Sequence, residues 1–201
     1  MKNTLIVIGR KFGSGGKLVA DAIGSRLGIK VYDRELVSEA AEKSGFSKVL
    51  FDRKDEKKGL FSNSGFFSVG RFGFVDNYLG DNELFKIQSQ VIRQIADEGP
   101  AIFVGRCSDY VLRDRKRLSV FVTAPAADCI KRVAGREGIS PEEASRYIDR
   151  QNRERETYYN YFTFGNWGVA SNYDLCVDTS ILGTDGTADF IISFAEKMGI
   201  A

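Results

Sequence analysis

The chain contains no histidine, a residue type on which much enzyme chemistry depends. This absence excludes Ser-His-Asp triads, general acid–base catalysis by imidazole, and metal sites with histidine ligands. Any chemistry is left to carboxylates, lysines, arginines and bound metal. Cysteine is also scarce. The three that occur, Cys107, Cys129 and Cys176, lack metal-ligand spacing, so we expect buried free thiols of a reducing cytosol.

Long apolar runs and a strong net charge are missing as well. No run reaches the length needed to span a membrane, and residues 1–9 lead into a core strand instead of a secretory signal. We therefore expect a cytoplasmic protein with no membrane partner. The 29 Lys and Arg residues nearly balance 27 Asp and Glu residues, which gives no bulk attraction to nucleic acid. Any anion site must be local.

What the chain does have is the pattern of an α/β protein. Its 201 residues and 43% hydrophobic content predict a single globular domain over residues 1–201. Short apolar segments alternate with helical patterns, which predicts a five-stranded parallel sheet flanked by helices, with ligands at its carboxyl edge. The expected strands are 5–9, 30–32, 101–104, 118–123 and 174–177, and the expected helices include 18–27, 84–95, 127–134 and 188–198.

One stretch does not follow this alternation. Residues 59–80 are crowded with glycine, serine and phenylalanine and show no clean period. We predict an inserted flap at about 47–80, in which glycine gives backbone mobility. The alternative is a long excursion packed on the core.

A glycine-rich turn follows the first strand and opens the first helix. It consists of Gly13, Ser14, Gly15, Gly16 and Lys17. Backbone amides and the positive end of a helix would meet an anion there with no side chain in the way. The segment resembles the P-loop of nucleotide kinases and predicts a phosphate-binding site.

The turn departs from the motif G-x-x-x-x-G-K-[ST]. Taking Lys17 as its lysine leaves no glycine at the first position, whereas aligning residues 13–15 with G-S-G puts Gly16 in the lysine position. In that second alignment Lys17 is rotated by about 100° around the helix. Neither alignment supplies the magnesium-binding hydroxyl of the motif, and the first alignment has Leu18 in its place. Arg10 is a candidate for the replacement charge. The alternative interpretation is an ordinary strand-to-helix turn.

A second informative region lies near residues 138–165, where we predict helices that form a lid. A capping box and a proline at 140–143 announce a helix. It then carries Arg146, Arg150 and Arg153 on one face, followed by Arg155. Such a row would clamp a triphosphate. Alternatively, these arginines pair with carboxylates four residues away on a solvated helix.

Taken in order, these motifs resemble those of cytidylate kinases. The order is the glycine loop, Asp33, the pair Gly105 and Arg106, the arginine-rich helix, and a last strand ending in residues 178–180. More closely, residues 10–16, 103–109, 158–168 and 172–180 resemble the cytidylate kinase-like family. The resemblance implies a three-layer P-loop NTPase fold with an arginine-rich helical lid. It also implies ATP and Mg as cofactors and a nucleoside monophosphate, CMP or dCMP, as the small-molecule substrate.

The resemblance also implies roles for individual residues. Residues 13–17 would hold the ATP phosphates, and Arg106, Asp33 and Arg150 would contact the acceptor. Asp33 would also contact Mg through water, although an aspartate after a strand is commonly a turn or cap former. Cys107 stands where the family relatives usually have aspartate, and the aromatic residues of 158–167 form either a base-stacking face or lid packing. The candidate catalytic residues are Arg10, Lys17, Asp33, Arg153 and Arg155.

Three other functions stay open from the sequence. A kinase for a different small acceptor would share every feature above. The altered glycine loop favours a nucleotide-binding protein without catalytic activity. A nucleic-acid-binding role would rest only on local arginines with aromatic neighbours.

Overall fold

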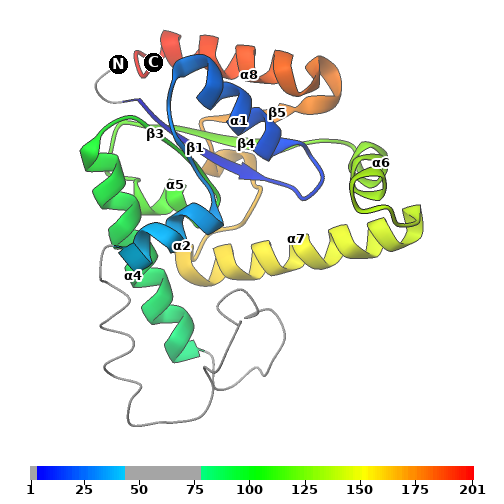
Figure 1. The fold of residues 1–201 in the computed structure, drawn as a ribbon, viewed down its shortest axis with the longest axis horizontal. Coiled ribbons are helices and arrows are strands. Elements are labelled where there is room, and N and C mark those ends of the chain that lie inside the picture. Colours follow the sequence, from blue (N-terminus) through cyan, green and yellow to red (C-terminus); the bar gives the residue numbers. More distant parts are fainter. Residues whose placement is uncertain (1–3, 44–77) are drawn as a thin grey trace.

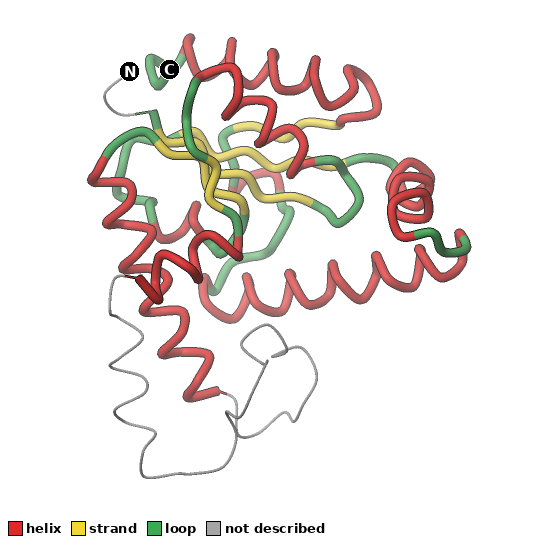
Figure 2. The backbone as a smooth tube through the Cα atoms, viewed as in Figure 1, coloured by secondary structure: helices red, strands yellow, loops and turns green. Residues whose placement is uncertain are grey.

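The structure is a computed structural model that describes residues 4–43 and 78–201, and it is built on one parallel sheet (Figures 1 and 2). The spatial order of the strands is β2-β3-β1-β4-β5, and every pair is parallel. This confirms the predicted five-stranded sheet. The strands are β1 (Leu5–Arg10), β2 (Val31–Tyr32), β3 (Ala101–Val104), β4 (Leu118–Thr123) and β5 (Leu175–Asp178).

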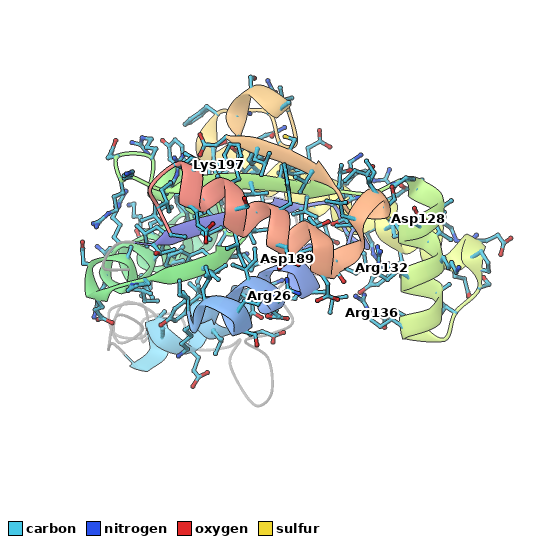
Figure 3. The ribbon with its side chains drawn as sticks, turned by 90° about the horizontal axis from the view of Figure 1, so that it is seen from above. Arg26, Asp128, Arg132, Arg136, Asp189 and Lys197 are labelled. Atoms are coloured by element: carbon cyan, nitrogen blue, oxygen red, sulfur yellow. The ribbon has the colours of Figure 1, made fainter. Side chains whose placement is uncertain are left out.

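Two helices, α1 (Gly16–Leu27) and α8 (Thr179–Lys197), cover one face of the sheet (Figure 1). Ile6, Ile23 and Ile191 pack in the shared core of this layer. At the exposed edge, Arg26 of α1 bonds the carbonyl and carboxylate of Asp185 at 2.9 Å and lies 3.2 Å from Asp189, both on α8 (Figure 3). These contacts join α1, which follows the glycine turn, to α8.

The opposite face is covered by α2 (Arg34–Lys43), α4 (Tyr78–Glu98) and α5 (Ser108–Val111). Phe103 of β3 and Ile92 of α4 are fully buried there. The sequence pattern predicted α4 but neither α2 nor α5. The predicted flap at 47–80 falls outside the described residues except for 78–80, which belong to α4 instead.

The remaining pair, α6 (Ala126–Glu137) and α7 (Pro141–Thr163), extends beyond the sheet (Figure 1). Ser140 caps α7: its hydroxyl accepts from the amide of Glu143, whose carboxylate accepts from the amide of Ser140. Val133 and Ala144 lie in a small core between the two helices. The predicted helical lid is therefore a two-helix arm that carries its own apolar contacts. A short helix, η1 (Ala170–Asn172), follows it.

The described residues bear on two expectations, the burial of the cysteines and the lack of a membrane-spanning segment. Cys107 and Cys129 are buried free thiols, but Cys176 is exposed, so the prediction of burial was wrong for that residue. β5 is an edge strand of the sheet, and Cys176 is exposed there while its neighbours in the strand are partly buried. No helix in the described ranges has both the length and the apolar composition to span a membrane.

Candidate functional site

The glycine turn lies between β1 and α1 and has the backbone geometry of an anion cradle. Gly13 and Gly15 have φ of 81° and 84°, a left-handed conformation that glycine adopts without strain. Gly15 caps α1. Among the described residues, none accepts a hydrogen bond from the amides of Gly15, Gly16 and Lys17. These donors at the positive end of a helix are suited to a phosphate group.

Ser14 supports this loop from within. Its hydroxyl and amide both donate to the carbonyl of Lys11, at 2.8 and 3.3 Å, and its own carbonyl accepts from the Thr179 hydroxyl at 2.7 Å. Ser14 is fully buried. Within the predicted phosphate site, Ser14 therefore stabilises the loop. Its amide and its hydroxyl both donate to the protein itself.

Arg132 of α6 approaches the same turn and was not among the predicted site residues. Its Nη1 donates a hydrogen bond to the carbonyl of Gly13. A β-carbon placed on Gly15 would lie 3.6 Å from its Cζ atom and 2.9 Å from Cγ2 of Thr184. In Figure 3, Arg132 lies on the side of α6 that faces α1 and α8. No local pattern in α6 marks this residue, because the contact joins segments far apart in the chain.

Arg10, at the end of β1, lies beside the start of α1. Its stem passes Gly16, where an added β-carbon would lie 2.6 Å from its Cβ atom. Desolvation by burial, with Arg155 and Arg106 nearby, lowers the pKa of Arg10 to about 9, while Asp33 acts in the opposite direction. The guanidinium is thus a cation at neutral pH in a place that disfavours its charge.

Lys17 points away from the amide cradle. Its Nζ lies 2.6 Å from Asp21 and 3.5 Å from Asp33, and its side chain is 48% exposed. Desolvation alone would lower the pKa of Lys17, but the contacts with these two carboxylates raise it. The lysine is therefore engaged by acidic side chains, which agrees with the rotation expected from the second alignment.

Asp33 follows β2 and caps α2. Its Oδ1 accepts from the amides of Glu35 and Leu36 at 3.1 and 3.2 Å, while Oδ2 faces Lys17. The cap interpretation is thereby confirmed for one oxygen. Within residues 4–43 and 78–201, no group of three or more cysteine or acidic side chains is placed to hold a metal. A magnesium ion bound mainly by phosphate oxygens and water does not need such a group.

The second turn, after β3, carries the predicted acceptor residue. Gly105, Arg106 and Cys107 have successive φ of 76°, 58° and 54°. Left-handed conformations at two non-glycine residues in a row are uncommon and strained. The turn aims Arg106 at Gln88 of α4, whose Oε1 accepts from Nε at 3.0 Å and from Nη2 at 2.5 Å.

Tyr158 of α7 completes this group. Its ring lies 4.5 Å from Cζ of Arg106, and its hydroxyl donates to Oε1 of Gln88 at 3.3 Å. Gln88 is only 2% exposed and was not predicted. A glutamine within the apolar pattern of a helix gives no local signal that it contacts Arg106.

The lid arginines divide into two groups. Arg155 Nη1 donates to the carbonyl of Arg10 at 3.0 Å, and its guanidinium lies 5.0 Å from the ring of Phe12. Burial lowers the pKa of Arg155 to about 10. Arg150 and Arg153 are exposed, and Arg150 lies over the ring of Tyr147 at 5.1 Å. The structure therefore brings Arg155 to the glycine loop, and it does not bring Arg150 or Arg153 there.

Phe12 connects the glycine loop with the arm. Its ring packs on Tyr147 at 5.1 Å, and its amide donates to Oδ1 of Asn152 at 2.8 Å. Asn152 and Phe12 were not predicted as site residues. Movement of α7 would therefore act directly on the loop.

Most of the aromatic residues at 158–167 pack against other rings. Phe162 stacks on Phe85 of α4 at 4.2 Å, and Trp167 meets Phe121 of β4 edge-on at 5.4 Å. Phe164 is instead 93% exposed, and the Tyr159 hydroxyl donates a hydrogen bond to Asp109. The packing interpretation is thereby confirmed for Phe162 and Trp167.

Comparison with known proteins agrees with this geometry. Residues 5–181 match the cytidylate kinase-like family. A cytidylate kinase of Methanopyrus kandleri is 30% identical over 196 residues, which cover 92% of this chain and 89% of that protein. The crystal structure of an uncharacterized protein from Eubacterium ventriosum ATCC 27560 superposes with a TM-score of 0.74 at 26% identity, covering 96% of this chain and 98% of the other.

A shikimate kinase from Bacteroides thetaiotaomicron shares the fold at a TM-score of 0.53 and 10% identity, with 96% of this chain and 98% of that chain covered. Together with the parallel sheet and the glycine loop, this likeness establishes a P-loop NTPase fold. The chain belongs to the cytidylate kinase-like family.

Proposed function

We propose that the protein transfers the γ-phosphoryl group of ATP to a nucleoside monophosphate, with CMP or dCMP as the acceptor. The bond from the γ-phosphorus to the β-γ bridging oxygen breaks, and a phosphate oxygen of the acceptor bonds to phosphorus. ADP and a nucleoside diphosphate are released. The relative named a cytidylate kinase and the family match support this choice of acceptor.

The observation that carries the proposal is the convergence of three arginines from three separate segments. Arg10 ends β1, Arg106 follows β3, and Arg155 belongs to α7, yet Arg106 and Arg155 both lower the pKa of Arg10. The strands β1 and β3 are parallel neighbours, with Ile8 beside Val104, so their carboxyl ends open on the same edge of the sheet. Two phosphate-bearing substrates would meet there.

The residues of the chain would act by binding and alignment. The loop amides would hold the phosphates of ATP, and Arg106 would hold the acceptor phosphate. Arg155 would close on the transferring group, whose charge spreads over its oxygens in the transition state. Bound Mg would neutralise phosphate charge, with Asp33 as its carboxylate contact. Such a site needs no imidazole, which suits a chain without histidine.

The test is ADP release by the purified protein with ATP and Mg, using CMP, dCMP, UMP, AMP and non-nucleotide alcohols as acceptors. We expect turnover to be fastest with CMP or dCMP. If only a non-nucleotide alcohol supported turnover, the acceptor would be an alcohol and not a nucleoside monophosphate. Tight ATP binding by calorimetry without ADP release from any acceptor would instead establish a catalytically silent nucleotide-binding protein.

The variant Arg106→Ala tests the placement of the acceptor. We expect the KM for the monophosphate to rise by about 100-fold or more, because a charged hydrogen-bond donor to phosphate is lost. The affinity for ATP should stay close to that of the wild type. An unchanged KM for the acceptor would contradict this placement.

A further inference from the structure

We propose that Arg10 performs the work of the missing P-loop lysine, and that position 16 is glycine because the arginine occupies the space a lysine there would need. The inference rests on the proposed function, since it concerns the phosphates of the same two substrates. It goes further by assigning the replacement charge and a site that spans donor and acceptor.

The structure selects one of the two motif alignments. Gly15 caps α1 and Gly16 is the first residue of this helix, so Gly15 takes the place of the second glycine in G-x-x-x-x-G-K-[ST]. Arg10 then stands at the first glycine, and Gly16 stands at the lysine. Compared with the motif, the positions of the charged residue and of a glycine are therefore interchanged.

The exchange has a steric cause. A β-carbon on Gly16 would lie 2.6 Å from Cβ and 3.1 Å from Cγ of Arg10. Cβ is fixed to the backbone and cannot rotate away, so the stem of Arg10 and a side chain at position 16 exclude one another. The two positions are therefore coupled, because a residue with a β-carbon at position 10 requires glycine at position 16.

The far end of Arg10 reaches the acceptor turn. A β-carbon on Gly105 would collide with Nη1 of Arg10 and lie 3.0 Å from its Cζ atom. Gly105 has a φ of 76° and immediately precedes Arg106. The side chain of Arg10 thus runs from the start of α1, where ATP phosphates would bind, to the turn that would hold the acceptor phosphate.

No ion pair joins the Arg10 guanidinium to a carboxylate among the described residues, although Asp33 is near enough to oppose the lowering of its pKa. Within the part of the chain that the structure describes, no carboxylate or carbonyl accepts a hydrogen bond from the Arg10 side chain. A planar guanidinium presents five donors in a fork, which suits contact with two phosphate groups at once. A lysine at position 16 would supply a point charge to the donor only.

The experiment is a double-mutant cycle made of Arg10→Gly, Gly16→Lys and the two combined. We expect each single variant to lose at least about 100-fold in kcat/KM for ATP. Arg10→Gly loses the charge, and Gly16→Lys clashes with the side chain of Arg10. The combined variant restores the first glycine and the lysine of the motif and removes the clash, so it should exceed both single variants by at least about tenfold. Activity of Arg10→Gly equal to the wild type, or a combined variant no better than the worse single one, would overturn the inference.

A second measurement keeps folding and binding apart. Arg10→Met keeps an unbranched stem but removes the charge, and Arg93→Met on the exposed face of α4 is the matched control. By calorimetry, we expect Arg10→Met to bind inorganic pyrophosphate at least about tenfold more weakly than the wild type and Arg93→Met. Its thermal midpoint without ligand should not fall, because burial and the nearby cations Arg155 and Arg106 disfavour the lost charge more than Asp33 favours it.

These measurements also separate the inference from the proposed function. A wild-type protein that forms no ADP with any acceptor refutes the function, and the pyrophosphate titration then decides the inference alone. Unchanged pyrophosphate affinity in Arg10→Met, or no pyrophosphate binding by the wild type, refutes the inference. Active wild type together with fully active Arg10→Met refutes the inference and leaves the function standing.

Discussion

The guanidinium of Arg155 donates a hydrogen bond of 3.0 Å to the backbone carbonyl of Arg10, which ties the arm helix α7 to the end of the central strand β1. Phe12 adds two further links, because its ring lies near the Arg155 guanidinium and its amide donates to Asn152. The glycine loop and the arm are thus one connected unit.

Arg155→Gln should lower kcat by about 100-fold or more if Arg155 has its proposed role, because the cation that would stabilise the transferring phosphoryl group is lost. Burial already lowers the pKa of Arg155, so removing its charge should leave the thermal midpoint nearly unchanged. Single-turnover kinetics with saturating ATP and CMP measure the effect, and Arg93→Gln is the control. A drop in stability with unchanged kcat would show that Arg155 has only a structural role.

Gln88 holds Arg106 and is a positioning residue in the proposed acceptor site. Gln88→Leu has similar volume but removes the oxygen that accepts from Arg106 and Tyr158, so we expect the KM for CMP to rise by about tenfold or more. The KM for ATP should change much less. Steady-state kinetics test this, with Gln94→Leu on the exposed side of α4 as the control.

A second substitution separates positioning from simple packing. Gln88→Glu keeps the acceptor oxygens but brings a negative charge toward the acceptor phosphate. We expect it to hold Arg106 and still raise the KM for CMP, with a thermal midpoint near that of the wild type. Equal increases in both substrate KM values for either variant would contradict a specific role at the acceptor.

The sheet and the long helices were predictable because their signals are local. Buried parallel strands are near-continuous apolar runs, so β1, β3 and β4 could be located within one residue. The cap and proline at 140–141 located the start of α7. In contrast, α5 spans only four residues, which is too short for a helical period to show.

The site was predictable only where one segment contains the whole signal. The glycine loop is such a segment, and its position followed from the sequence. Spacing also showed that Arg146, Arg150 and Arg153 share a face of α7, but it cannot show where that face points. Arg155 lies near the opposite side of the helix and is the one that meets the loop.

The other supporting residues depend on contacts between distant segments. Arg132 and Gly13 are 119 residues apart, and Gln88 and Tyr158 are 70 apart. Neither pair produces a pattern within a window of the sequence. The path of Arg10 to Gly105 likewise required the pairing of β1 with β3.

Thr179 braces the glycine loop from α8, and its hydroxyl is the part that matters. Thr179→Val has the same shape but leaves the carbonyl of Ser14 without this buried donor, so we expect a loss of about 1–2 kcal/mol in the free energy of unfolding. Thr179→Ser keeps the hydroxyl and should lose less. Urea unfolding measures both variants. A smaller loss in Thr179→Val than in Thr179→Ser would show that methyl packing matters here and the hydroxyl does not.

Asp109 should make stability depend on pH. Tyr159 donates to its carboxylate at 2.7 Å, yet burial outweighs this and raises the pKa of Asp109 above its ordinary value of 3.8. Between these two pKa values the folded chain holds a proton that the unfolded chain has released. The stabilisation is therefore complete at lower pH and is lost as pH rises through this window, by up to about 1.4 kcal/mol per pH unit.

Asp109→Asn keeps an acceptor for the Tyr159 hydroxyl and removes this titration. Its free energy of unfolding, relative to the wild type, should increase as pH rises from about 4 and then level off once the wild-type carboxylate is ionised in the folded state. Urea unfolding from pH 4 to 8 gives the curve, with the exposed Asp114→Asn as the control. A difference that is constant across this range would mean that Asp109 ionises in the folded protein as it does in the unfolded chain, despite its burial beside Tyr159.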